Sequence, residues 1–169
     1  MYKGIKSLAK TMQGGTLLDI DCGSAPYRAL FDVEFYWGLD IIKFDDCINV
    51  HCDVSYNGQE LPFRDSSVDF AVMSEVLEHV FEPHTLLSEI YRFLKPKGKL
   101  LLTVPFVWDE HEQPYDFGRY TSYGIKYILE KNKFIVDIHR KNGFYINTLT
   151  QMISSYIYCL IDQDFLCLH

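Results

Sequence analysis

The fold is decided by residues 16–25, which read TLLDIDCGSA. We expect Thr16–Ile20 to form a short apolar strand and the small residues after it to form a tight turn. Pro26 suits the first position of a following helix, because its ring fixes φ near the helical value. A strand, a small-residue turn and a helix bring backbone N–H groups close to a bound ligand. The stretch therefore predicts a ligand site at the end of a first strand.

Strands and helices alternate through the rest of the chain. Apolar spacing predicts helices at 5–12, from Pro83, after Thr121 and at 145–161, and strands at 34–39, 47–52, 68–74, 99–104 and 134–138. This alternation predicts one α/β domain over residues 1–169, with a Rossmann-like, doubly wound, mostly parallel sheet and helices on both faces. Ligands of such sheets bind beyond the carboxyl ends of the strands, where the strand order reverses.

Composition narrows the function classes. The formal net charge of -7 over 169 residues argues against nucleic acid as a partner, because nucleic acid attracts basic surfaces. The five cysteines are an odd number and do not have the spacing of a disulfide framework. No signal peptide is recognised before them, so we predict reduced thiols and a cytoplasmic location. Cys47, His51 and Cys52 lack the paired spacing of zinc sites, and we predict no metal. Polar residues interrupt residues 146–168, so no membrane-spanning segment is predicted.

Acidic residues follow the predicted second and third strands. Asp40 comes 17 residues after Gly23, where a carboxylate can accept hydrogen bonds from both ribose hydroxyls of an adenosine cofactor. A helix N-cap is the alternative role for Asp40. Asp53 fits either a carboxylate near an adenine amino group or a turn acid.

The opening stretch resembles the first motif of class I S-adenosyl-L-methionine (SAM) dependent methyltransferases, D-x-G-x-G-x-G after an apolar strand. Asp19 and Gly23 match this motif, whereas Asp21 and Ala25 stand where glycines are usual. Asp21 could pair with the α-ammonium group of the cofactor or block the site. The ordered series Cys52-Asp53-Val54, Leu61-Pro62-Phe63, Ser67-Val68-Asp69-Phe70 and Glu75-Val76-Leu77-Glu78-His79-Val80 is similar to the small-molecule branch that includes the ubiquinone and menaquinone enzymes (methyltransferase type 11-like).

The resemblance covers about residues 17–144 and implies an enzyme that uses SAM and releases S-adenosyl-L-homocysteine. The cofactor-binding residues it implies are Asp19, Asp21, Cys22, Gly23, Ser24, Asp40, Ile41, Asp53, Val54, Ser74 and Glu75. A nicotinamide-dependent dehydrogenase is disfavoured, because the turn lacks G-x-G-x-x-G. A SAM-fold protein that binds a ligand or partner without turnover remains the alternative.

Residues 111–121 are similar to a subgroup that carries H-x-x-P-x-D-F-x-R-Y-T after the fifth strand, often beside glycan or surface-polymer genes. The resemblance implies a loop above the sulfonium methyl group and a small-molecule or saccharide acceptor. We expect His111, then His79, as catalytic base, and Trp108, Tyr115, Asp116 and Arg119 as substrate contacts. Two alternatives stay open, a structural pair between Asp116 and Arg119 and a structural His79.

The carboxyl-terminal part departs from the resemblance. The fold normally adds a last antiparallel strand after residue 138, and residues 165–169 are barely long enough for it. We therefore expect this strand to be short or missing and the sheet edge to be covered by a partner, as in a homodimer. The sequence leaves the acceptor and the methylated atom open.

Overall fold

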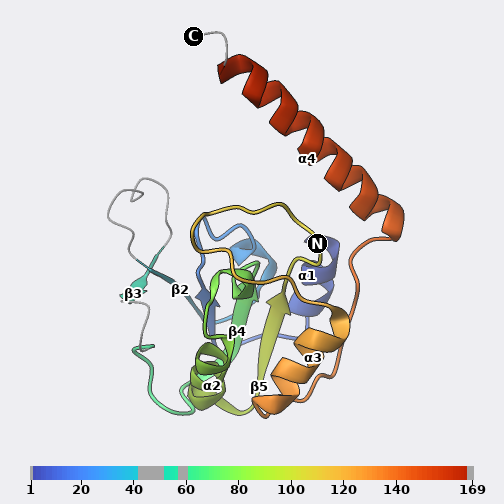
Figure 1. The fold of residues 1–169 in the computed structure, drawn as a ribbon. Helices are drawn as coiled ribbons and strands as arrows, with labels where there is room; N and C mark the ends of the chain where they lie inside the picture. Colours follow the sequence, from blue (N-terminus) through green and yellow to red (C-terminus); the bar gives the residue numbers. More distant parts are fainter. Residues whose placement is uncertain (1, 42–51, 57–60, 167–169) are drawn as a thin grey trace.

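The computed structural model describes residues 2–41, 52–56 and 61–166, and five parallel strands form one sheet within them. The strands are β1 (Thr16–Ile20), β2 (Phe35–Ile41), β3 (Val54–Tyr56), β4 (Val68–Ser74) and β5 (Leu94–Thr103). The helices are α1 (Tyr2–Ala9), α2 (Pro83–Phe93), α3 (Ser122–Lys131) and α4 (Tyr145–Leu166), with short 3-10 helices η1 (Arg28–Leu30) and η2 (Leu77–His79). The predicted α/β fold with a parallel sheet is confirmed (Figure 1).

The strand order is β3-β2-β1-β4-β5, so the order reverses between β1 and β4. The chain runs outward from β1 through β2 to β3, and then crosses back to place β4 on the other side of β1. Strand β1 is buried from Leu17 to Ile20, as expected for a central strand that is covered on both faces. Because parallel strands all end at one edge, the residues that follow β1, β2 and β4 meet there.

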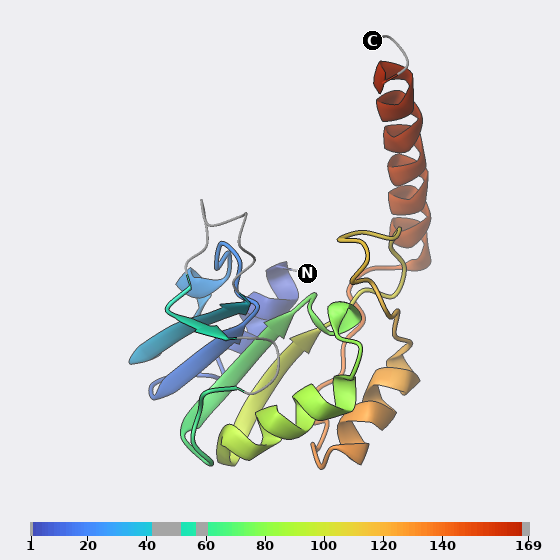
Figure 2. The ribbon, with the colours of Figure 1, turned by 60° about the vertical axis from the view of Figure 1, so that its left-hand side comes forward.

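Helices cover both faces of the sheet (Figure 2). On one face, Leu18 of β1 and Met73 of β4 belong to a core with α2 and Ile125 of α3. On the other face, Leu17 of β1 belongs to a core with Ile5 of α1. Neighbouring residues of a strand therefore serve opposite cores, which is the period-two pattern of a strand.

Several predicted elements differ from the structure. Strand β5 begins at Leu94, whereas the sequence predicted its start at 99. The strand predicted at 134–138 is wrong: the segment is irregular, because Phe134 packs its ring against Tyr91 at 5.6 Å and no strand pairs with it. After Pro26 the chain forms only η1, since Ala25 adopts φ +49° and its carbonyl accepts from Arg28 N. The third strand is Val54–Tyr56, and residues 47–51 of its predicted span lie outside the described residues.

The chain after α3 leaves the sheet. Helix α4 extends away from the strands (Figure 1), and Tyr145 and Ile146 at its start are exposed. No strand follows β5 within residues 104–166, as predicted for a short or missing last strand. None of the helices in the described part of the chain has the length and apolar character that a bilayer crossing requires.

Candidate active site

The turn after β1 is held against the end of β2. The backbone N–H of Gly23 donates to Oδ2 of Asp40 at 3.0 Å, and the N–H of Cys22 donates to the carbonyl oxygen of Leu39 at 3.1 Å. Gly23 has φ +50° and no atom within 4 Å of the position of a Cβ, so space is open beside its backbone. The turn therefore presents backbone to an open side, with the Asp40 carboxylate fixed across it.

Two other turn residues, Asp21 at φ +56° and Ala25 at φ +49°, adopt the left-handed conformation that glycine accepts most easily. They stand where the first motif usually has glycine, so two of its three glycine positions here carry a side chain at a positive φ, and Gly23 holds the third. Strain of about 1–3 kcal/mol for each such residue is typical of functional turns. Asp21 and Ser24 are exposed.

Asp19 lies below the turn and is buried, with 4% of its surface exposed. The Tyr36 hydroxyl donates to its Oδ2, which links β1 to β2. Burial raises the pKa of Asp19 to about 6, against the lowering effect of the Tyr36 hydrogen bond. Burial also raises the pKa of the neighbouring Cys22 thiol to about 12. The buried side chains of Asp19 and Cys22 therefore pack on the inner side of the turn.

The start of β3 is joined to β2 by Asp53. Its Oδ2 accepts from the N–H of Gly38 at 2.8 Å and lies 3.9 Å from the guanidinium of Arg28. Ile41 is 39% exposed at the end of β2, and Val54 packs partly buried against the core beneath α2.

The end of β4 supplies the last two predicted cofactor residues. The Ser74 hydroxyl lies 3.0 Å from the Thr103 hydroxyl of β5, and Glu75 adopts φ +57° while its N–H donates to the carbonyl oxygen of Thr103. The structure thus places all eleven predicted cofactor residues in or just after β1, β2 and β4 or at the start of β3. This is where the strand order predicts a ligand.

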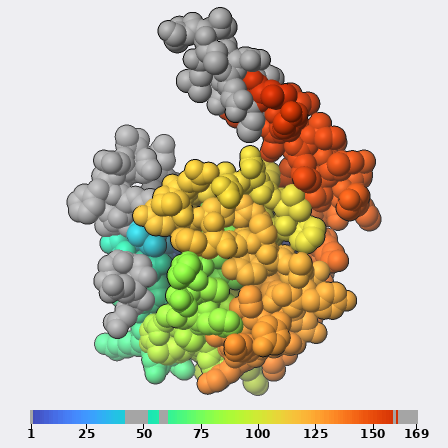
Figure 3. Space-filling view, in the orientation of Figure 1, coloured from blue at the N-terminus to red at the C-terminus, as the bar shows by residue number. Residues whose placement is uncertain are grey.

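A second group of side chains lies beside η2. The loop after β5 passes over it, and the N–H groups of Phe117 and Gly118 donate to the main-chain oxygen of Glu78 at 2.7 and 3.1 Å. His79 and His111 meet edge to face, with ring centroids 4.7 Å apart. Figure 3 shows the loop, in yellow, lying over the molecule beside the green segment. The structure therefore brings together the two histidines that the sequence predicted as base candidates.

Asp116 and Arg119 form the pair that was the structural alternative. Guanidinium NH2 of Arg119 lies 2.7 Å from Oδ2 of Asp116, whose side chain is only 5% exposed. The hydrogen bond from Arg119 is the main reason that the pKa of Asp116 lies well below its usual range. Asp116 also accepts from the N–H of His111 at 3.0 Å. The pair therefore positions His111, while Trp108 and Tyr115 expose their rings, at 44% and 56%.

Glu78 is a site residue that the sequence analysis did not select. It is fully buried, and neither carboxylate oxygen accepts a hydrogen bond from another of the residues that the structure describes. Burial raises its pKa, and the nearby charge of Glu75 acts in the same direction. The sequence signal for Glu78 was its position between Leu77 and His79 in the E-V-L-E-H run. Its burial is notable because acids are seldom fully buried without a partner.

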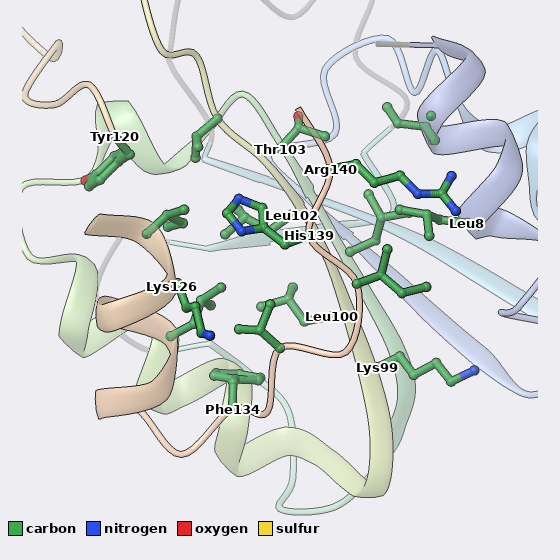
Figure 4. Close-up of a pocket in the computed structure, with 18 of the residues that line it drawn as sticks. Leu8, Lys99, Leu100, Leu102, Thr103, Tyr120, Lys126, Phe134, His139 and Arg140 are labelled. Carbon is green, nitrogen blue, oxygen red and sulfur yellow. The ribbon is translucent and has the colours of Figure 1, made fainter. Parts of the chain in front are cut away.

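A groove of about 1770 Å³ runs along β5 and adjoins this group. Figure 4 shows Leu100 and Leu102 of β5, Lys126 of α3, and His139 around it. One end of the groove is lined by Glu75, Glu78, Trp108 and His111. Space beside His111 is thus continuous with the groove.

Comparison with known proteins settles the family. The family described as "Methyltransferase domain" matches residues 18–102, just over half of the chain. The chain belongs to this methyltransferase family. Phosphoethanolamine N-methyltransferase 2 of Caenorhabditis elegans is 35% identical over 89 residues, which are 53% of this chain and 20% of that protein. Demethylmenaquinone methyltransferase of Listeria welshimeri is 31% identical over 114 residues, which cover 58% of this chain and 48% of that protein.

A solved structure repeats the fold of this methyltransferase chain. Haemonchus contortus phosphoethanolamine N-methyltransferase 2, in complex with S-adenosyl-L-methionine, aligns with a TM-score of 0.61 at 19% identity. The alignment covers 93% of this chain and 41% of that one. The chain therefore spans less than half the length of these relatives.

Proposed function

We propose that this chain, as a single domain, binds SAM and transfers its methyl group to a small-molecule or glycan-type acceptor. The contact between Gly23 and Asp40 carries the proposal. It fixes an acid at the end of β2 beside an exposed turn, which is the arrangement that recognises the ribose of an adenosine cofactor. Family membership supports the reaction class, and the relatives' names support a small acceptor.

The proposed cofactor pocket uses the strand ends as follows. Asp40 would accept from the ribose hydroxyls, Asp53 with Val54 and Ile41 would lie on the adenine side, and Gly23 would approach the amino-acid end. Asp21 is exposed beside that end and carries the charge needed to pair with an α-ammonium group. Asp19 and Cys22 support the turn from inside, and Ser74 and Glu75 close the pocket toward η2.

The acceptor would lie beneath the loop that holds Trp108 and Tyr115. Their exposed rings suit the face of a sugar or another ring, and the groove along β5 gives access. Methyl transfer is an in-line displacement at carbon, so orientation supplies much of the rate. A hydroxyl acceptor must lose a proton as the new bond forms. We propose His111, with His79 as the second choice, as the group that takes it.

The cofactor part of the proposal is tested by thermal unfolding with SAM, S-adenosyl-L-homocysteine and, as control, NAD. A ligand at 100 times its Kd stabilises by about 2.7 kcal/mol, which raises the Tm by about 5–11 °C in a domain of this size. Asp40→Asn should weaken SAM binding by about 10- to 150-fold, since a hydrogen bond to a charged group contributes about 1.5–3 kcal/mol. Asp32→Asn, an exposed acid before β2, is the matched control. If neither SAM nor its product shifts the Tm, the cofactor proposal fails, and the alternative of a partner-binding protein without turnover is then favoured.

The catalytic part is tested separately. His111→Ala should lower turnover on the true acceptor by about 10²- to 10⁴-fold while the Kd for SAM stays unchanged. His84→Ala, at the start of α2 and outside the lining of the groove, is its control. Full turnover in His111→Ala would remove His111 from the mechanism.

Two further parts of the proposal concern the setting of the protein. Strand β5 is the outermost strand on its side of the described sheet, and we infer that a second copy of the chain covers this edge. Sedimentation of the purified chain as a monomer at all concentrations would contradict the homodimer.

The thiols of Cys22 and Cys52 support a reducing, cytoplasmic setting, which localisation of a tagged protein can check.

A further inference from the structure

The buried carboxylate of Glu78 is the polar group whose position is least explained by methyl transfer. Its side chain is 1% exposed, and neither oxygen has a hydrogen-bond partner among the described residues. Buried charges in proteins are normally paired or bound to a metal. An orphaned carboxylate that points at two imidazoles therefore indicates a missing positive charge.

In both imidazoles Nδ1 contacts a backbone carbonyl oxygen, and Nε2 does not take part in that contact. Nδ1 of His79 lies 2.8 Å from the carbonyl oxygen of Tyr115, and Nδ1 of His111 lies 3.1 Å from that of Asp109. Carbonyl oxygens only accept, so we assign the proton of each neutral ring to Nδ1. Nη2 of Arg119, which can only donate, lies farther from Nδ1 of His111, at 3.5 Å, so the shorter contact with the carbonyl oxygen of Asp109 decides this assignment. Each Nε2 then keeps its lone pair. A metal-bound histidine is typically oriented in this way, with its other nitrogen donating to a backbone carbonyl or a carboxylate.

The distances suit a small cation. Nε2 of His79 lies 3.9 Å from Oε1 of Glu78, and one ligand atom from each of Glu78, His79 and His111 lies within 4.8 Å of the others. Ligands about 2.1 Å from a tetrahedral ion are about 3.4 Å apart, so small side-chain rotations would close the site. We propose that Glu78, His79 and His111 bind a divalent transition-metal ion. Two imidazoles favour zinc or a similar ion over magnesium or calcium.

The surrounding charges favour a cation. Nη2 of Arg119 lies 3.5 Å from Nδ1 of His111, and the charge of Arg119 is balanced by its pair with Asp116. The carboxylate of Glu78 remains, with that of Glu75 close enough to act on it. Three protein ligands also leave a coordination position open for water or for an oxygen of the acceptor.

This inference goes beyond the proposed methyl transfer and departs from the sequence-based expectation of no metal. It also alters one step. With a cation bound, His111 would be a ligand, and the ion would acidify a hydroxyl acceptor so that its proton passes to solvent rather than to an imidazole base. The O–CH3 bond would then form as the S–CH3 bond of SAM breaks. Metal binding itself does not depend on SAM, so the two proposals can fail independently.

The experiment uses the purified chain, stripped with a chelator and kept reduced, and titrates it with Co²⁺ while visible absorption and the Tm are followed. We expect one Co²⁺ per chain and a rise in Tm. Glu78→Gln and His111→Gln should each weaken Co²⁺ binding by about 100-fold or more, because losing a group that only orients a ligand already costs about 10- to 100-fold. The exposed residues Glu82 and His139 give matched controls, Glu82→Gln and His139→Gln, which should bind as the wild type does.

Three outcomes would overturn the site. These are no Co²⁺ binding, unchanged binding in both Glu78→Gln and His111→Gln, or a thiolate spectrum that disappears in Cys52→Ser. Circular dichroism of the variants shows that they are folded. A Tm shift with SAM in the presence of chelator separates loss of the metal site from failure of the methyltransferase proposal.

Discussion

Replacement of Glu78 by methionine should stabilise the protein when metal is removed by a chelator. Glu78 of η2 is fully buried, and its two carboxylate oxygens have no hydrogen-bond partner in the described part of the chain. Methionine has a similar volume and a flexible side chain that fills the same space without polar atoms that need a partner. Removal of an unsatisfied buried polar group avoids its desolvation penalty of about 1–3 kcal/mol.

The gain in stability should appear as a Tm increase of about 2–12 °C, because 1 kcal/mol corresponds to about 2–4 °C in a domain of 150–250 residues. It should also depend on pH. Burial raises the pKa of Glu78 above its ordinary value of 4.5, so the native state holds the proton at a pH where the unfolded chain has lost it. The free energy of unfolding of the wild type therefore falls as pH rises above about 4.5. Glu78→Met lacks this decline, so its free energy of unfolding should exceed that of the wild type by an amount that grows from pH 4 toward pH 7.

Urea unfolding with and without chelator, repeated across this pH range, measures both effects. Glu82→Met, an exposed neighbour, is the control and should change the free energy of unfolding by less than about 0.5 kcal/mol. A Glu78→Met variant that is less stable than wild type in chelator would refute the reasoning, because it would show that the carboxyl group is satisfied in the metal-free protein.

Two further predictions concern the carboxyl groups with shifted pKa values. Asp116→Asn should lower the free energy of unfolding by about 1–3 kcal/mol at pH 7, since the variant loses the charged hydrogen bonds with Arg119. Because the pKa of Asp116 is lowered, its contribution to the free energy of unfolding is present above about pH 4 and is lost in acid. Urea unfolding should therefore show the stabilities of wild type and variant converging in acid. An equal difference in stability at every pH would contradict this. Tyr36→Phe should move the pKa of Asp19 above about 6, since the Tyr36 hydroxyl is the hydrogen-bond donor that lowers it. Because this pKa is raised, stability falls as pH rises through it, and carbon NMR of Asp19 should show the titration moving upward, whereas an unchanged midpoint would exclude the hydrogen bond as a cause.

The central strands could be predicted from local sequence. Thr16–Ile20 and Val68–Ser74 match the structure residue for residue. Both are apolar runs that are bounded by turn residues and buried on both faces, so their pattern does not depend on which strand lies beside them. The order of the strands in the sheet was not predicted, because local apolar runs do not specify their neighbours.

Features that depend on distant contacts were not predictable in this way. The apolar residues at 134, 136 and 138 alternate as in a strand, but a strand needs a partner, and this segment has none in the described sheet. The sequence E-V-L-E-H-V does not show that η2 buries the side chain of Glu78. The pairing of Asp116 with Arg119 was predicted only as an alternative, because spacing alone does not show whether a charged pair faces solvent or ligand.

The proposed cofactor and acceptor sides are joined by one short segment. Glu75 leaves β4 at φ +57° and is held by the carbonyl oxygen of Thr103, and three residues later the main chain of Glu78 anchors the loop that carries His111. An in-line transfer requires the two reactants to be aligned closely, and a misplacement of about 1 Å can reduce the rate about 100-fold. Glu75 follows β4 in the left-handed conformation and η2 begins two residues later, so the chain passes from the proposed cofactor side to His79 within residues 75–79.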